Sequence, residues 1–113
     1  MFSKQDTFDR VYLGLKAQDF QRATNNVGSC VFQNSNNLRC AIGHLPPDNL
    51  LPKNATISSL LDLDYNFHDF HDYSLVLDLM KAHDQGTTPF LMQNMLEVVA
   101  HKFKLEIPND PPV

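Results

Sequence analysis

The fold is decided by residues Tyr73–His83, which read YSLVLDLMKAH. On a helical wheel the apolar side chains of this stretch spread over a broad arc, while Ser74, Asp78 and Lys81 occupy the opposite side. A helix with so wide an apolar arc is contacted by other elements on several sides. We therefore predict a central helix over about residues 69–84.

Two further helices are predicted, one on each side of this stretch in the chain. The first covers about residues 4–20, where Ser3 can cap the free backbone N–H groups of the first turn. The other covers about residues 88–104 and has Pro89 at its first position, where the missing N–H costs nothing. Their apolar stripes, at the helical spacing, are Phe8, Val11, Tyr12 and Leu15 in the first and Met92, Met95, Leu96, Val99 and Phe103 in the last.

Between the first two helices the sequence predicts an antiparallel β-hairpin. Residues 29–33 and 38–42 are short β-compatible runs, and four polar residues, NSNN, separate them. Asparagine tolerates the left-handed backbone that tight hairpin turns need. The fold class that we predict is α+β, with three main helices packed on one antiparallel hairpin and a long Pro-rich loop over residues 43–56.

The composition bounds the function. The chain has 113 residues and a net charge of −4, from 13 acidic and 9 basic side chains. This balance argues against a protein that binds nucleic acid by neutralising phosphates. No run approaches the roughly 18 apolar residues of a membrane span, and the first residues, MFSKQD, lack the apolar core of a secretory signal. We expect a cytoplasmic protein without membrane contact, built as one globular domain over residues 1–107 with a flexible tail over 108–113.

Cys30, Cys40 and His44 are of the residue types that bind zinc, and the predicted hairpin would bring the two cysteines together. Structural zinc sites use four ligands, with the first pair usually two to four residues apart, and the spacing here is wider. Two reduced, buried thiols and a turn histidine are the alternative, and we expect no metal and no cofactor. A fourth ligand would come from one of three further histidines, His68, His71 or His83.

Three His-Asp dipeptides occur, at residues 68–69, 71–72 and 83–84. Such a pair binds metal in one class of helical phosphohydrolases, so a small metal-dependent hydrolase is an alternative function. A physical explanation for the pairs is capping. Asp69 and Asp72 fall at the start of the predicted central helix, where a carboxylate accepts from free N–H groups, and the third histidine falls at its end, where it can bond the last carbonyls.

The stretch Cys30–Asp48, CVFQNSNNLRCAIGHLPPD, resembles a motif of small, mostly uncharacterised proteins of bacteriophages, prophages and bacteria. That motif is C-x-Y-R-G-P-x-G-L-K-C-A-x-G-x-L-I-P-D. This chain has Gln33 in place of the arginine, Asn34 and Asn37 in place of the glycines, and Ser35 in place of the proline. Replacing glycine by asparagine keeps access to the left-handed backbone, whereas losing the arginine removes a contact for an anion or a carboxylate.

The likeness extends to a K-Q-x-x-F-D pattern in the first helix and an L-x-x-x-H-D pattern ahead of the last one, so that it covers most of the chain. It implies a phage or bacterial origin and a place in the cytoplasm, which for a phage protein is that of the host cell. It implies no particular activity.

Three functional classes follow from these observations. The first is a non-catalytic interaction protein whose partner is a host protein, such as an inhibitor of a host enzyme or of a defence complex. The others are a metal-stabilised binding domain and the small hydrolase. We place the contact surface in the hairpin and the loop after it, about residues 33–49, because binding residues concentrate on loops held by a rigid scaffold. The predicted contact residues are Phe32, Gln33, Asn34, Asn36, Asn37, His44, Leu45 and Asp48, with Phe32 or Leu45 as the apolar anchor.

Overall fold

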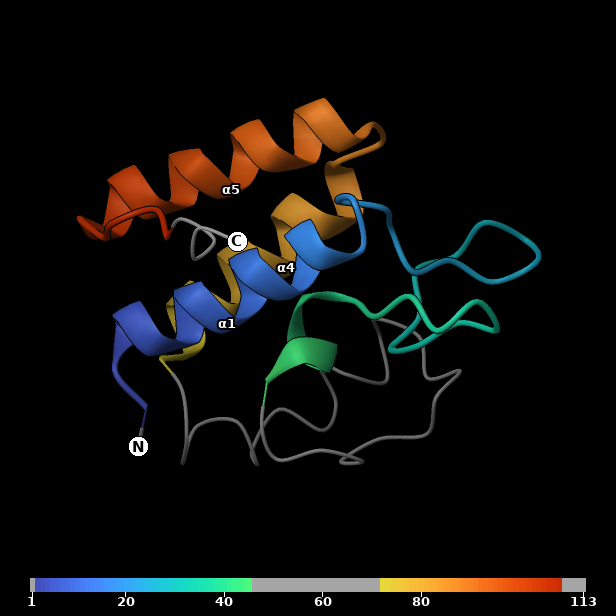
Figure 1. Cartoon of the computed structure of the whole chain (residues 1–113), viewed down its shortest axis with the longest axis horizontal. Helices are drawn as coiled ribbons and strands as arrows, with labels where there is room; N and C mark the ends of the chain where they lie inside the picture. Colours follow the sequence, from blue (N-terminus) through green and yellow to red (C-terminus); the bar gives the residue numbers. More distant parts are fainter. Residues whose placement is uncertain (1, 46–71, 109–113) are drawn as a thin grey trace, which may run out of the picture.

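A computed structural model of the chain describes residues 2–45 and 72–108. It has three α-helices in these parts, α1 (Lys4–Ala17), α4 (Tyr73–Gln85) and α5 (Pro89–Phe103), together with the short 3₁₀ helix η1 (Ala41–His44). In Figure 1, α1 passes in front of α4, α5 lies along the outer edge above them, and η1 lies below α1. The predicted Pro-rich loop falls outside the described residues from position 46 onward.

The three predicted helices are present, and each begins where a side chain caps its first turn. Each cap residue has extended backbone, so its side-chain oxygen can accept from an N–H group that has no partner inside the helix. The three bonds are Asp6 N–H to Ser3 Oγ at 3.0 Å, Leu75 N–H to Asp72 Oδ1 at 3.0 Å and Leu91 N–H to Thr88 Oγ1 at 3.1 Å.

The central position predicted for the second helix is confirmed. Contacts join α4 to α5, to α1 and to η1. Leu75 and Leu79 of α4 are fully buried, and the polar imidazole side chain of His83 is also 0 % exposed. The apolar stripes of the neighbouring helices close around them, through Phe8, Val11, Tyr12 and Leu15 of α1 and Met92, Leu96, Val99 and Ala100 of α5.

The predicted β-hairpin, and with it the α+β class, is wrong for the described residues. Residues 24–39 form two successive turns, and each is closed by a single isolated bridge, Thr24 with Cys30 and Gln33 with Arg39. The second predicted strand does not form because its last residues, Ala41 and Ile42, start η1 and pack into the core. The described structure is therefore helical.

The turn chemistry behind the hairpin prediction is nevertheless present. Asn37 has a φ of 63°, the left-handed conformation that asparagine tolerates. The side-chain oxygen of Asn34 accepts from the backbone N–H groups of Asn36 and Leu38, each at 3.0 Å. These bonds satisfy the backbone N–H groups of the turn locally. The turn can therefore form without a row of strand pairs beside it.

The residue after α4, Gly86, must be a glycine for a steric reason. Its φ is −78°, which any residue adopts. A Cβ at this position would lie 2.7 Å from the Cα of Met92 and 2.8 Å from the carbonyl oxygen of Ala82. The glycine thus lets the start of α5 pack directly on the end of α4.

Gly86→Ala is therefore expected to destabilise the protein by about 1–3 kcal/mol, the usual cost of overpacking. Urea unfolding followed by circular dichroism would measure the change. Thr87→Ala is the matched control, because Thr87 is exposed and next in the chain. Equal stability of the two variants would show that the turn between α4 and α5 accommodates a side chain.

Candidate functional site

The predicted contact residues lie in two different environments. Phe32 and Leu45, which we expected as apolar anchors, are 7 % and 1 % exposed and belong to the core. Asn36 and Asn37 are exposed at the tip of the turn, and Gln33 is half-buried, with its amide donating to the Asn37 side chain at 3.2 Å. Asp48 lies outside the described residues. The surface that these residues offer is therefore amide-rich and lacks its two expected anchors.

A shallow hollow of about 370 Å³ lies between the two turns of this region. The amide oxygen of Asn25 accepts from the N–H groups of Val27 and Ser29, and the amide nitrogen of Asn34 donates to the Thr24 carbonyl. These two side chains therefore hold the turns in shape. The lining of the hollow is Thr24, Asn25, Asn26, Val27, Asn34 and Ser35.

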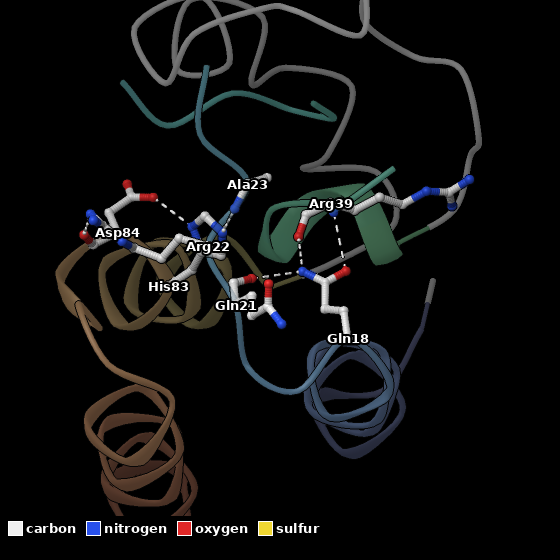
Figure 2. A network of polar contacts seen from close by, with 7 residues as sticks. All are labelled: Gln18, Gln21, Arg22, Ala23, Arg39, His83 and Asp84. Carbon is white, nitrogen blue, oxygen red and sulfur yellow. Dashed lines mark hydrogen bonds and ion pairs between the residues drawn. The ribbon is translucent and has the colours of Figure 1, made fainter. Parts of the chain in front are cut away.

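Gln18, just after α1, links this helix to Arg39 at the end of the second turn (Figure 2). Its amide nitrogen donates to the carbonyls of Gln21 and Arg39, at 2.9 and 2.7 Å, and its amide oxygen accepts from the Arg39 N–H at 3.1 Å. The same oxygen lies 3.2 Å from Nε2 of His44. Since the oxygen can only accept, Nε2 carries a proton and donates it.

His44 is consequently a structural histidine. A Cβ at Gly14 would collide with its imidazole ring, so the glycine on α1 makes room for it. Burial lowers the pKa of His44 from 6.5 to about 4, with further lowering from the positive charge of Arg39 and from the nearby imidazole of His83. The folded protein therefore keeps this imidazole neutral over the whole physiological pH range.

The three ligand-type side chains that meet in the described parts of the chain are not the predicted set. Cys30, His83 and Asp84 place their Sγ, Nδ1 and carboxylate oxygen within 4.8 Å of one another. Cys40 and His44, which we had grouped with Cys30, do not join them, and His68 and His71 lie outside the described residues.

The ring of His83 is bonded on both sides, as Figure 2 shows. Nε2 accepts the N–H of Ala23 at 3.1 Å, and Nδ1 lies 2.8 Å from Oδ1 of Asp84. A nitrogen that accepts carries no proton, so the neutral ring is protonated on Nδ1 and donates to Asp84. Arg22 adds a bond from its guanidinium to the Asp84 carbonyl at 3.1 Å. The predicted bond from this histidine to the last carbonyls of its helix is replaced by a bond to the loop after α1.

This arrangement does not fit a metal ion. Ligation through Nδ1 would move the ring proton to Nε2, where it would face the Ala23 N–H and break that bond. Burial and the neighbouring Asp84 raise the pKa of Cys30 from 9.0 to about 11, so its thiolate is also costly to form. The cluster is a hydrogen-bonded node that ties the end of α4 to the loop after α1.

The remaining His-Asp pairs offer no further site in the described residues. Asp72 caps α4, as predicted, and lies 3.9 Å from the ammonium of Lys4. Cys40 is fully buried and is a free thiol, like Cys30. Burial raises the pKa of Cys40 from 9.0 to about 12, which leaves it inert as a nucleophile.

The feature that sequence reasoning missed is on α5. Phe90, Leu91 and Val98 are 75, 40 and 65 % exposed, although all three are large and apolar. The sequence carries a signal for it, since Leu91 and Val98 are seven residues apart and lie beside the core stripe instead of within it. The last helix carries more apolar residues than its core stripe requires. This excess is the sequence pattern that indicates an exposed apolar surface.

No family model matches the chain, and no curated protein or solved structure is significantly similar to it. The resemblance of the Cys30–Asp48 stretch to phage and bacterial proteins therefore stays a prediction.

The pKa of His44 leads to a prediction on acid stability. Because the folded pKa is lowered, the unfolded chain binds a proton near pH 6.5 that the folded protein does not bind until about pH 4. The contribution of neutral His44 to the free energy of unfolding is complete above pH 6.5 and is lost as the pH falls towards 4. Between pH 7 and 5 the wild-type protein should lose about 2 kcal/mol more unfolding free energy than His44→Gln. His101→Gln, at an exposed histidine of α5, should retain the wild-type slope, and equal slopes for all three proteins would contradict the assignment.

The thiols lead to a second prediction. A pKa raised by about two units lowers the thiolate fraction about a hundredfold, so iodoacetamide at pH 7.5 should alkylate Cys30 about a hundredfold more slowly in the folded protein than in guanidinium. Cys40 should react more slowly still. Mass spectrometry of wild type and Cys40→Ala would follow each site. Rapid alkylation of folded protein at Cys30 would show that burial and the neighbouring Asp84 do not suppress its thiolate.

Proposed function

We propose that this protein acts by binding another protein, and that α5 supplies the contact surface. The observation that carries the proposal is the exposure of Phe90, Leu91 and Val98 on this one helix. Leu91 and Val98, seven residues apart, lie on one face of the helix, and exposed apolar side chains that share a face are candidates for an interaction surface. Among the other described residues, Val27 in the first turn is the remaining large apolar side chain of this kind, 83 % exposed.

The apolar surface of α5 is more than folding requires. Met92, Leu96 and Ala100 are at most 1 % exposed and already anchor the helix to the core. Leu91 and Val98 lie on a separate flank, so replacing them by polar residues would leave that anchoring unchanged. In Figure 1, α5 lies along the outer edge of the structure.

The partner class comes from the resemblance in the sequence. A phage or bacterial origin supports a host protein as the partner and the host cytoplasm as the place of binding, for example with an inhibited host enzyme or defence complex. None of the helices in the described segments has the length and hydropathy that would let it cross a bilayer. A metal-stabilised domain and a hydrolase receive no support from the Cys30–His83–Asp84 geometry.

A matched pair of variants tests the surface. Val98→Glu puts a charge on α5 with a good helix former, and Val27→Glu makes the same change on the amide-rich turn. Burying a valine contributes about 1.5 kcal/mol or more, so Val98→Glu should lower the recovery of specifically bound bacterial host protein at least about tenfold. Val27→Glu should bind as the wild type does.

Immobilised protein, a bacterial lysate and quantitative mass spectrometry provide the measurement, with thermal melting to verify that both variants fold. Loss of binding in Val27→Glu alone would move the contact surface to the turns, as the sequence first suggested. Unchanged binding in both variants would refute the α5 surface.

A further inference from the structure

A groove of about 320 Å³ runs between α4 and α5 on the side of α5 that carries Val98. Its floor is apolar and consists mainly of the buried Ala82 and Val99, with Met95 and Val98 on the α5 side. The residues that line it are Asp78, Lys81, Ala82 and Gln85 of α4 and Met95, Val98, Val99 and Lys102 of α5.

The two walls of the groove are straight. Residues three and seven positions apart lie in line on a helix, so each wall extends over about two turns, or roughly 10 Å. The ammonium of Lys102 lies 2.6 Å from Oδ2 of Asp78, a bond that joins the two walls at one end. At the other end, Leu91 continues the α5 wall by a further turn. The wall residues are Asp78, Lys81 and Gln85 on α4 and Met95, Val98 and Lys102 on α5.

A straight apolar trough between two helices has the shape that receives a third helix, as in helix-in-groove recognition. An extended strand would need unpaired backbone groups along the wall, and the backbone of both helices is bonded within itself. The shape therefore favours a helical occupant that presents an apolar stripe of similar length.

The charges on the groove walls determine which charge a bound helix should carry. Asp78 is paired with Lys102, which leaves Lys81 as the unbalanced charge of the groove. Lys81 is exposed, and its ammonium makes no hydrogen bond or ion pair within residues 2–45 and 72–108. The groove thus has a local excess of one positive charge on a chain whose net charge is −4.

We propose that the groove seats an acidic amphipathic helix of the partner protein, with its apolar stripe on Met95 and Val98 and a carboxylate opposite Lys81. This inference rests on the proposed function and specifies the partner's chemistry. The carboxylate of the occupant supplies the charge that the groove lacks, and its leucine-type side chains cover the apolar wall that water now contacts.

A second copy of this chain fits the groove less well. Were its α5 to lie in the groove, the same flank would enter, and the charged member of that flank is Lys102. Glu97 is on another side of α5, where its carboxylate accepts from the hydroxyl of Tyr12 at 3.2 Å. The second copy would therefore bring a lysine, and no carboxylate, to the surface that already holds Lys81.

The test uses two stapled helical peptides of about 15 residues, since unconstrained helices of this length are marginal in water. Both carry leucine at i, i+4 and i+7, and they differ only in having glutamate or lysine beside that stripe. Fluorescence anisotropy with the full-length protein should give a Kd at least about tenfold lower for the acidic peptide, and added salt should narrow the difference.

Two variants locate the binding. Lys81→Glu should remove or reverse the preference for the acidic peptide, whereas Arg10→Glu, the same charge change on an exposed residue of α1, should leave it unchanged. Val98→Glu should weaken both peptides at least about tenfold. Equal affinity for the two peptides, failure of both to bind, or a preference that Lys81→Glu does not alter would each overturn the inference.

Sedimentation equilibrium distinguishes the second copy as occupant. A wild-type dimer that Val98→Glu dissociates would overturn the partner helix in favour of self-association. The lysate experiment on Val98→Glu is independent of the peptides. If it succeeds while the peptides fail, α5 binds a partner of other chemistry and the proposed function stands; if the lysate binding is unaffected by Val98→Glu, the proposed function itself fails.

Discussion

Leu75 and Leu79 are fully buried because α1, α5 and η1 each contact a different side of α4. This burial is the constraint on which the other features depend. It requires the glycine at position 86, where the start of α5 turns back against the end of α4. It also places His83, on the last turn of α4, in an environment without water, so that both of its ring nitrogens need partners from the protein.

Those partners explain why the histidines that the sequence offers as candidate metal ligands have structural roles. His83 connects Ala23 to Asp84, and His44 donates to Gln18. In the described residues every buried side-chain nitrogen or oxygen has a hydrogen-bond partner, so none is held in reserve for a ligand. A proton or a metal ion on Nε2 of His83 would break the bond from the Ala23 N–H, which holds the loop after α1 in place.

The proposed contact surface is therefore one that takes no part in the core. One flank of α5 packs against α4, while Leu91 and Val98 on the next flank remain in water. The same helix thereby contributes to stability and presents an apolar wall, and the groove beside α4 gives that wall a direction and a charge through Lys81. An interface of this kind separates binding from folding, because substitutions on the exposed flank spare the core.

The sequence by itself determined the three helices and the starts of the first and the last, because helical periodicity and capping are local: Ser3, Asp72 and Thr88 each cap a helix that the spacing of apolar residues predicts. The central helix begins at Tyr73, about one turn later than the predicted start near residue 69. The sequence also indicated the asparagine turn, with Asn37 in the left-handed region. It could not show that Ala41 and Ile42 leave the predicted strand for η1, because their burial depends on helices distant in the chain.

Only the tertiary structure decided which polar residues meet. Cys30 lies beside His83 and Asp84, more than fifty positions away, and not with Cys40 and His44, which formed the alternative metal set in the sequence. Likewise Leu91 and Val98 look like core residues in a list of apolar positions, and their exposure follows from how α5 is rotated against α4. Periodicity gives the faces of a helix, but the packing of its neighbours determines which face is covered.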